Sequence, residues 1–137
     1  MTMGYEIFWP MLVQISLSVA ILFWLAWSRV SRIARQGMSE IRKTGFPSHV
    51  VNAGDNFKNQ FEVPVLFYAL CLFFFVTDGV TQFVLIAAWV FVAARILHAL
   101  VQLTKNVIFP YRFGAFLMSA IAILVMILLA FSHLAAI

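Results

Sequence analysis

The chain is 137 residues long, with 64% hydrophobic residues, 10% charged residues and a formal net charge of +4. Soluble domains are nearer half apolar and about a quarter charged, so this composition and a mean hydropathy of +1.01 exclude a soluble domain and indicate lipid surroundings. The single cysteine, Cys71, excludes an internal disulfide and a cysteine-cluster metal site.

Four apolar stretches predict four membrane-spanning helices within one domain, residues 1–137. A spanning helix needs about 20 mostly apolar residues, and the second stretch reaches that length only if its helix begins near Asp55 or Asn56. Irregular backbone facing lipid would leave polar groups unsatisfied. The expected fold class is therefore an all-α, integral membrane four-helix bundle with helices over about 7–35, 55–77, 82–104 and 111–134.

The distribution of basic residues predicts the orientation of these helices. Between the first two helices lie Arg29, Arg32, Arg35, Arg42, Lys43 and Lys58, and the turn between the last two is flanked by Lys105 and Arg112. The other side shows only Glu6, Asp78 and His133. The positive-inside rule places both termini on the non-cytoplasmic side. We expect a multi-pass protein, in the cell inner membrane if the source is bacterial.

The loop between the first two helices indicates where the first helix continues and where it ends. Arg29, Arg32 and Arg35 are spaced three residues apart, which predicts that the first helix continues into the cytoplasm. Gly37 and the cluster that begins at Gly45 are expected to end the helical path there.

The third helix carries polar side chains on one stripe, Arg95, His98 and Gln102, at spacings of three and four. An arginine at the centre of a spanning helix costs about 2.5–3.5 kcal/mol, so Arg95 needs a partner. Glu62 is the acidic residue nearest that depth on the cytoplasmic side, and a structural Glu62–Arg95 ion pair is expected. With Lys58 and Asn59 one turn earlier, the same groups could instead form a polar pocket open to the cytoplasm.

Arg112 follows Pro110 in what should be the first turn of the fourth helix. A cation there opposes the helix dipole, whereas a helix start combined with an arginine suits a bound anion. The alternative is an interfacial anchor of the positive-inside kind. The three histidines are spread along the chain, and we expect no metal site.

These motifs, in this order, resemble the MAPEG superfamily, the membrane-associated proteins of eicosanoid and glutathione metabolism. The resemblance covers about residues 5–135. It rests on an NxxE motif with a nearby proline, an RxxH motif and a Pro-x-Arg motif, formed by Asn59, Glu62 and Pro64, by Arg95 and His98, and by Pro110 and Arg112.

The resemblance implies a homotrimer that binds glutathione between neighbouring subunits near the cytoplasmic side. Lys58, Asn59 and Glu62 would line the glutathione site, and His98 would contact the cofactor from the third helix. Arg112 would be the catalytic residue that stabilises the thiolate, and it also belongs to the cofactor-binding set. The other partners implied are membrane lipid and a lipophilic substrate or ligand, and no nucleic acid.

Two functions follow from the resemblance. The first is a glutathione-dependent transferase or peroxidase acting on lipophilic electrophiles. The second is a non-catalytic membrane scaffold or lipophilic-ligand-binding protein of the same fold. It is favoured by Gln102, Phe113 and Phe116, which stand where family enzymes carry tyrosine or serine hydroxyls. A small transporter or a subunit of a larger complex is a third possibility, although no pair of broken helices is evident.

Overall fold

The computed structural model describes residues 3–137, and every regular element in that range is a helix. Four helical stretches are long and apolar enough to cross a membrane, namely Gly4–Gln36, Ser48–Val76, Gln82–Leu103 and Ile108–Ala136. The individual helices are α1 Met3–Glu6, α2 Phe8–Gln36, α3 Met38–Thr44, α4 Ser48–Asn59, α5 Val63–Val76, α6 Gln82–Leu103, η1 Ile108–Arg112 and α7 Phe113–Ala136.

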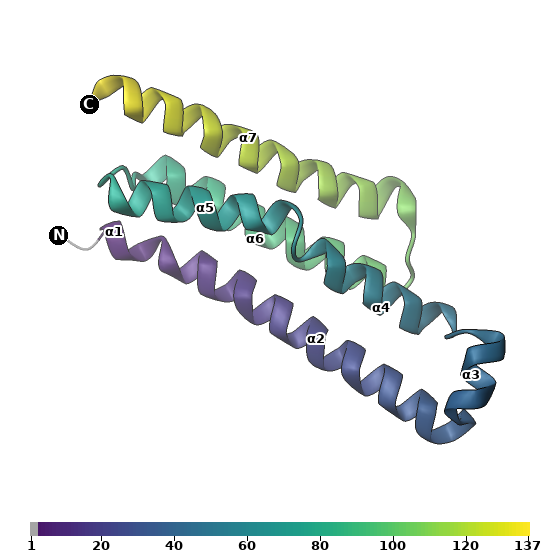
Figure 1. Cartoon of the computed structure of the whole chain (residues 1–137). Coiled ribbons are helices and arrows are strands. Elements are labelled where there is room, and N and C mark those ends of the chain that lie inside the picture. Colours follow the sequence, from purple (N-terminus) through teal and green to yellow (C-terminus); the bar gives the residue numbers. More distant parts are fainter. Residues whose placement is uncertain (1–2) are drawn as a thin grey trace.

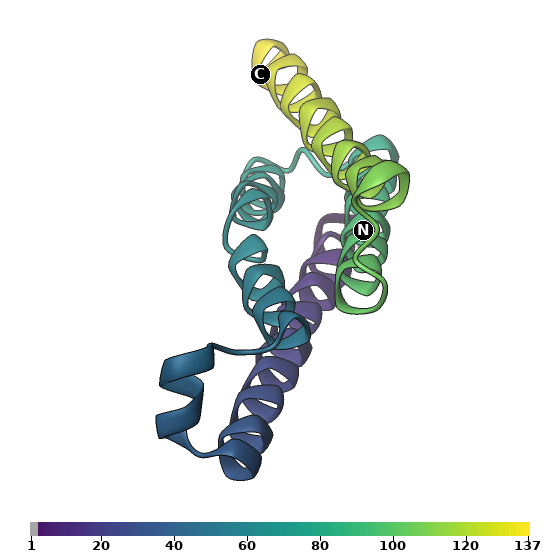
Figure 2. The ribbon, with the colours of Figure 1, turned by 90° about the vertical axis from the view of Figure 1, so that its right-hand side faces the viewer.

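Helix α6 is the centre of the bundle and buries more residues than any other helix. Helix α7 packs along α6, while α2 packs against α4 and α6 (Figure 1). The end-on view shows α4 and α5 on one side and α6 with α7 on the other (Figure 2). A stacked pair of rings, Phe67 and Phe91 with centroids 4.4 Å apart, lies in the core with Cys71 and Met126. The start of α1 and the end of α7 lie at the same end of the bundle.

The first long helix ends where the glycine signals predict. Gly37 and Gly45 both have a φ of 78°, a left-handed conformation that glycine adopts without a steric penalty. Each N–H donates to a carbonyl four residues earlier, from Ile33 and from Ile41 respectively. Between the two glycines the chain forms the short helix α3, which the sequence pattern did not indicate.

The second span differs from the predicted helix over 55–77 in two ways. It begins at Ser48, and it is interrupted at residues 60–62, where Glu62 has φ −96° and ψ −101° (Figure 1). Pro64 explains the interruption, because it lacks an N–H for the carbonyl four residues earlier and its ring clashes with that carbonyl. The break separates α4 from α5 and turns the backbone at Glu62.

The fourth span also starts earlier than the expected residue 111. A short π-helical turn, η1, precedes α7 and contains a kink at Phe109, whose φ and ψ are −121° and 136°. Arg112 lies at the junction, in helical conformation, directly before Phe113. The predicted helix over 82–104 matches α6 to within one residue.

Three buried amide side chains connect the first span to α4 and α6. Gln14 Nε2 donates to Gln60 Oε1 at 2.9 Å, and Gln60 Nε2 donates to Asn56 Oδ1 at 3.1 Å. Asn56 Nδ2 in turn donates to the carbonyl oxygen of Ala99 at 3.1 Å. This amide ladder fixes how α2, α4 and α6 are placed relative to one another, because a displaced helix would leave buried polar groups unpaired.

The opposite end of the bundle is closed by a contact between α7 and the turn after α5. His133 Nε2 lies 3.1 Å from the carbonyl oxygen of Thr77. A Cβ atom on Gly79 would lie 2.6 Å from the His133 ring, so glycine is required for this close approach. The ring also packs edge-on against Phe73.

Candidate functional site

A polar cavity of about 400 Å³ lies where the α4–α5 break, α6 and the start of α7 meet. The break places Asn59 and Glu62 on its wall, and the polar stripe of α6 supplies Arg95 and His98. The remaining lining residues come from η1 and α7: Ile108, Arg112, Phe113 and Phe116. Charged and amide groups thus lie beside two phenylalanine rings in one cavity.

Arg95 is 1% exposed, and its guanidinium Nη2 donates to the backbone carbonyl of Asn59 at 2.9 Å. The expected Glu62–Arg95 ion pair is therefore not formed within the chain. Among residues 3–137, the ion pair within 4.0 Å is Lys58 with Asp55. The physical reason is the helix break, because the last carbonyls of a helix lack intrahelical donors and the carbonyl of Asn59 serves as the acceptor for Arg95.

Two buried nitrogens on the cavity wall have no hydrogen-bond partner, Arg95 Nε and His98 Nδ1. His98 is 3% exposed, and its ring centroid lies 6.3 Å from that of Phe116. Buried polar groups are normally hydrogen-bonded, and an unpaired one needs an explanation. Both atoms are shielded from solvent, so a molecule in the cavity reaches them only if the side chains shift.

Asn59 and Gln102 also meet at this site. Asn59 Nδ2 donates to Gln102 Oε1 at 3.2 Å, which ties the end of α4 to the last turns of α6. Gln102 is buried, and its amide oxygen is used by this bond.

Arg112 reaches the cavity from the junction of η1 and α7 and is held from the loop before it. Its Nη1 donates to Asn106 Oδ1 at 3.0 Å, and Asn106 Nδ2 donates to Asn52 Oδ1 at 3.2 Å. The guanidinium is thereby connected to α4 through two neutral amides.

Lys58 is the predicted site residue that the cavity does not include. Its side chain is 79% exposed, and its ammonium lies 3.8 Å from Asp55 Oδ1. The helix break changes the angular relation between Lys58 and Glu62, which a continuous helix would have placed on one face. The structure therefore brings together Asn59, Glu62, His98 and Arg112 and leaves Lys58 on the surface.

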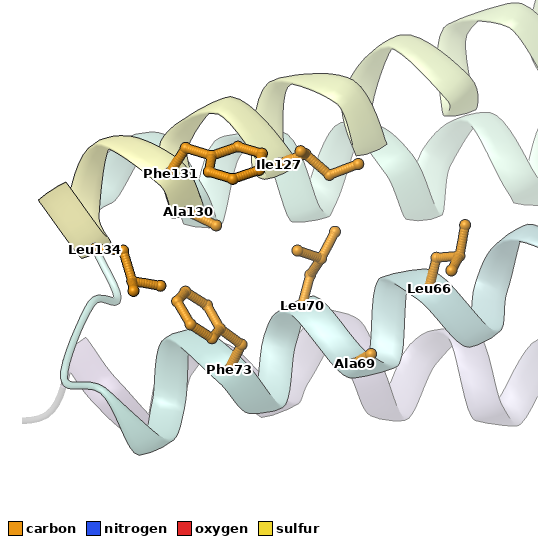
Figure 3. A pocket seen from close by; sticks show the side chains of 8 residues that line it. All are labelled: Leu66, Ala69, Leu70, Phe73, Ile127, Ala130, Phe131 and Leu134. Carbon is orange, nitrogen blue, oxygen red and sulfur yellow. The ribbon is translucent and has the colours of Figure 1, made fainter.

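An apolar groove of about 400 Å³ runs between α5 and α7 (Figure 3). Side chains from the two helices point toward one another across it, from Leu66, Ala69, Leu70 and Phe73 on α5 and from Ile127, Ala130, Phe131 and Leu134 on α7. Leu66 follows Glu62 by four residues, or about 6 Å along a helix. On α7 the two sites are farther apart, because the cavity includes Phe116 and the groove begins at Ile127. The groove is therefore a separate apolar surface nearer the opposite end of the bundle.

Comparison with protein families accounts for nearly the whole chain, since the model of the MAPEG family matches residues 7–132. The chain belongs to the MAPEG family. A comparison with curated proteins and one with solved structures gave no match. MAPEG proteins include glutathione-dependent transferases and peroxidases as well as non-catalytic members. Membership and the four apolar helices identify an integral, multi-pass membrane protein.

Sequence reasoning missed two residues that support the cavity of this MAPEG protein. Arg95 was expected either in an ion pair with Glu62 or, with the same groups, at a polar pocket, and it lines the cavity. Asn52 and Asn106 were not singled out, although they hold Arg112. A usable signal existed for Asn106, because it follows the end of α6 by three residues and asparagine tolerates a left-handed backbone better than most residues.

Proposed function

We propose that the protein is a glutathione-dependent membrane transferase or peroxidase that acts on lipophilic electrophiles. The observation that carries the proposal is the convergence of Asn59, Glu62, Arg95, His98 and Arg112 on one cavity within a MAPEG chain. The carboxylate and the cations are complementary to the charges of a zwitterionic thiol peptide.

The proposed chemistry follows from the charges at the cavity. A thiol is a weak nucleophile until it ionises, and a neighbouring cation favours the thiolate. Arg112 is the proposed catalytic residue, because it lines the cavity and its charge has no carboxylate partner within 4.0 Å among the described residues. Glu62 complements the ammonium of glutathione, while His98 and Asn59 offer hydrogen bonds.

In the transferase reaction, the thiolate sulfur forms a bond to carbon of the electrophile and a leaving group departs with its electron pair. In this proposal the lipophilic substrate approaches laterally from the membrane, and the apolar groove between α5 and α7 is a surface on which it can bind. Phe113 and Phe116 then provide apolar contacts beside the reacting sulfur.

The proposal includes a homotrimer with both termini on the non-cytoplasmic side and glutathione bound near the cytoplasmic face. The cavity lies at the cytoplasmic end of the spans in this orientation, next to the basic loops. Lys58 is retained as a cation at the rim, because its exposed ammonium is available to a glutathione carboxylate or to a neighbouring subunit.

The test compares the conjugation of glutathione to a chlorinated aromatic compound by the native protein, Arg112→Ala and Arg112→Lys. Removal of one electrostatic stabiliser typically lowers kcat by about 10²-fold or more, and that is the expected loss for Arg112→Ala. Arg112→Lys should retain part of the rate because it keeps the charge. Arg42→Ala, which removes an exposed loop arginine, serves as the control. Equal rates for all four proteins would remove Arg112 from the mechanism.

The second candidate is a non-catalytic protein that binds a lipophilic ligand. It is favoured by Phe113 and Phe116, which occupy the cavity wall without a hydroxyl, and by Gln102, whose oxygen is bonded to Asn59. Calorimetry separates the two functions. Heat from glutathione binding at millimolar or tighter affinity supports the enzyme, whereas binding of an apolar ligand with no heat from glutathione supports the second candidate.

A further inference from the structure

A chain of side-chain hydrogen bonds holds Arg112 from outside the cavity. Arg112 Nη1 donates to Asn106 Oδ1 at 3.0 Å, and Asn106 Nδ2 donates to Asn52 Oδ1 at 3.2 Å. The three residues belong to different parts of the fold, the η1–α7 junction, the loop after α6 and helix α4. We call these residues the Asn52–Asn106–Arg112 relay.

The middle member of the relay is fixed by its backbone as well as by its side chain. Asn106 has a φ of 47°, in the left-handed region that asparagine tolerates better than most residues. Its N–H donates to the carbonyl of Val101 at 2.7 Å, which secures the loop against the end of α6. The side-chain oxygen that accepts from Arg112 therefore has a defined position.

Both partners in the relay are uncharged amides, and this matters for the charge in the cavity. A carboxylate at position 106 would pair with the guanidinium and cancel most of its field. An amide oxygen accepts the same hydrogen bond but leaves the full positive charge available. The nearby acid of α4, Asp55, lies against Lys58, and the acid on the cavity wall is Glu62.

We propose that Asn106, anchored by Asn52, is a positioning residue that aims the guanidinium of Arg112 into the cavity without neutralising it. This inference rests on the proposed thiol chemistry for its consequence, because an oriented and uncompensated cation favours a bound thiolate. Asn106 acts through Arg112 and does not touch the reacting atoms.

The chain offers closely matched variants for a test. Asn106→Gly removes the amide and keeps the left-handed backbone free of strain, and Asn106→Asp keeps the shape and adds a negative charge. Lys105→Gln is the control, because it changes the net charge by the same amount at the adjacent, exposed position. Asn52→Ala removes only the anchor.

The first readout is the pH midpoint at which bound glutathione ionises, followed by the ultraviolet absorbance of the thiolate. Asn106→Asp is expected to raise this midpoint by about one pH unit. The new carboxylate neutralises Arg112, and a nearby cation commonly shifts the ionisation of an acid by one to three units. Asn106→Gly should lower kcat about tenfold, the order of one lost hydrogen bond to a charged group. Asn52→Ala should give a smaller loss in the same direction, and Lys105→Gln should match the native protein.

The second readout does not depend on glutathione. In selectively labelled protein, restricted rotation of the Arg112 guanidinium gives separate nuclear magnetic resonance signals for its terminal nitrogens, assigned by their loss in Arg112→Lys. We expect these signals to average in Asn106→Gly and to stay separate in Lys105→Gln. If the native protein forms no bound thiolate, the proposed function fails while this measurement still decides the relay. Native-like guanidinium signals in Asn106→Gly, or equal midpoint shifts in Asn106→Asp and Lys105→Gln, would overturn the relay.

Discussion

Gln14 and Gln60 place uncharged amides where a membrane helix normally carries hydrocarbon. Gln14 is fully buried in α2, and its Nε2 donates to Gln60 Oε1 at 2.9 Å. In hydrocarbon an unpaired amide is costly, so any arrangement of the helices that breaks this bond is penalised. The bond therefore fixes the placement of the helices more than it adds to net stability. The amide ladder holds α2 beside the α4–α5 break and therefore supports the wall of the cavity.

A double-mutant cycle measures that bond. Gln14→Leu is expected to destabilise the fold by about 1 kcal/mol, because Gln60 Oε1 loses its donor. The double variant Gln14→Leu/Gln60→Leu should cost less than the sum of the two single variants, with a coupling of about 0.6–1.7 kcal/mol as found for polar pairs in membrane proteins. The measurement is denaturant unfolding in mixed micelles, followed by tryptophan fluorescence.

Gln82→Leu provides the control for this cycle, because it makes the same chemical change at an exposed position at the start of α6. It should alter the unfolding free energy by less than about 0.5 kcal/mol. Strict additivity of the Gln14 and Gln60 variants would contradict a bond that both residues share.

Arg95 shows which features of a single residue can be predicted from the sequence. Its depth in the third span and its need for a partner were readable from the sequence, because a buried guanidinium is expensive. The identity of that partner was not, because Glu62 is the nearest acid along the sequence and a free backbone carbonyl leaves no signal there. The guanidinium bonds to the Asn59 carbonyl, an acceptor that exists only because a helix ends there.

At the scale of helices, the break between α4 and α5 organises the site. It frees the Asn59 carbonyl for Arg95 and turns Glu62 to the cavity wall, while leaving Lys58 outside. Pro64 is the cause, and its position in the first turn of α5 lets the second half of the span continue as a regular helix.

Replacing this proline should therefore join α4 and α5 into one helix and lower the affinity of the site for glutathione. In Pro64→Ala the restored N–H allows α4 and α5 to join, with a gain of about 1 kcal/mol for the new backbone bond and about fivefold slower amide hydrogen exchange at residues 60–63. Glutathione affinity should fall, because Glu62 leaves the cavity wall. Both effects are measurable in nanodiscs.

Pro47→Ala is the matched control, because Pro47 precedes α4 and lies far from the break in the chain. Exchange at residues 60–63 should be unchanged in this variant. Unaltered exchange in Pro64→Ala as well would show that another feature causes the break.

The helix boundaries show the same division between what was predictable and what was not. Gly37 ended the first long helix as the sequence predicted, because a glycine with positive φ stops a helix in any surroundings. The start of α4 at Ser48 was missed, since residues 48–54 are too polar for a spanning segment. They become helical by packing against α2, with Val50 and Ala53 buried.

At the scale of the whole molecule, α6 packs along α7 and against α2 and α4, whereas α5 packs against α7 and α2. The apolar groove of Figure 3 lies between α5 and α7. The four-helix bundle could be predicted from the composition and from the four apolar stretches of the sequence. The groove was not predictable, because it depends on the spacing between α5 and α7.

Orientation in the membrane is tested by the reactivity of single cysteines in a Cys71→Ala background. A membrane-impermeant maleimide applied to intact cells should label Asp78→Cys, which lies in the exposed turn between α5 and α6. Lys105→Cys, in the exposed turn after α6, should react only after the membrane is opened, because basic loops remain cytoplasmic. The reverse pattern would invert the proposed topology and place the cavity on the other face.

The contact between His133 and the turn after α5 determines which nitrogen of the imidazole carries a proton. A carbonyl oxygen only accepts, so the proton in the bond to Thr77 must sit on Nε2 of the imidazole. The neutral Nε2–H tautomer and the imidazolium ion both carry that proton. Either form of the ring can therefore keep the tether between α7 and the α5–α6 turn, at the end of the bundle where α1 starts and α7 ends.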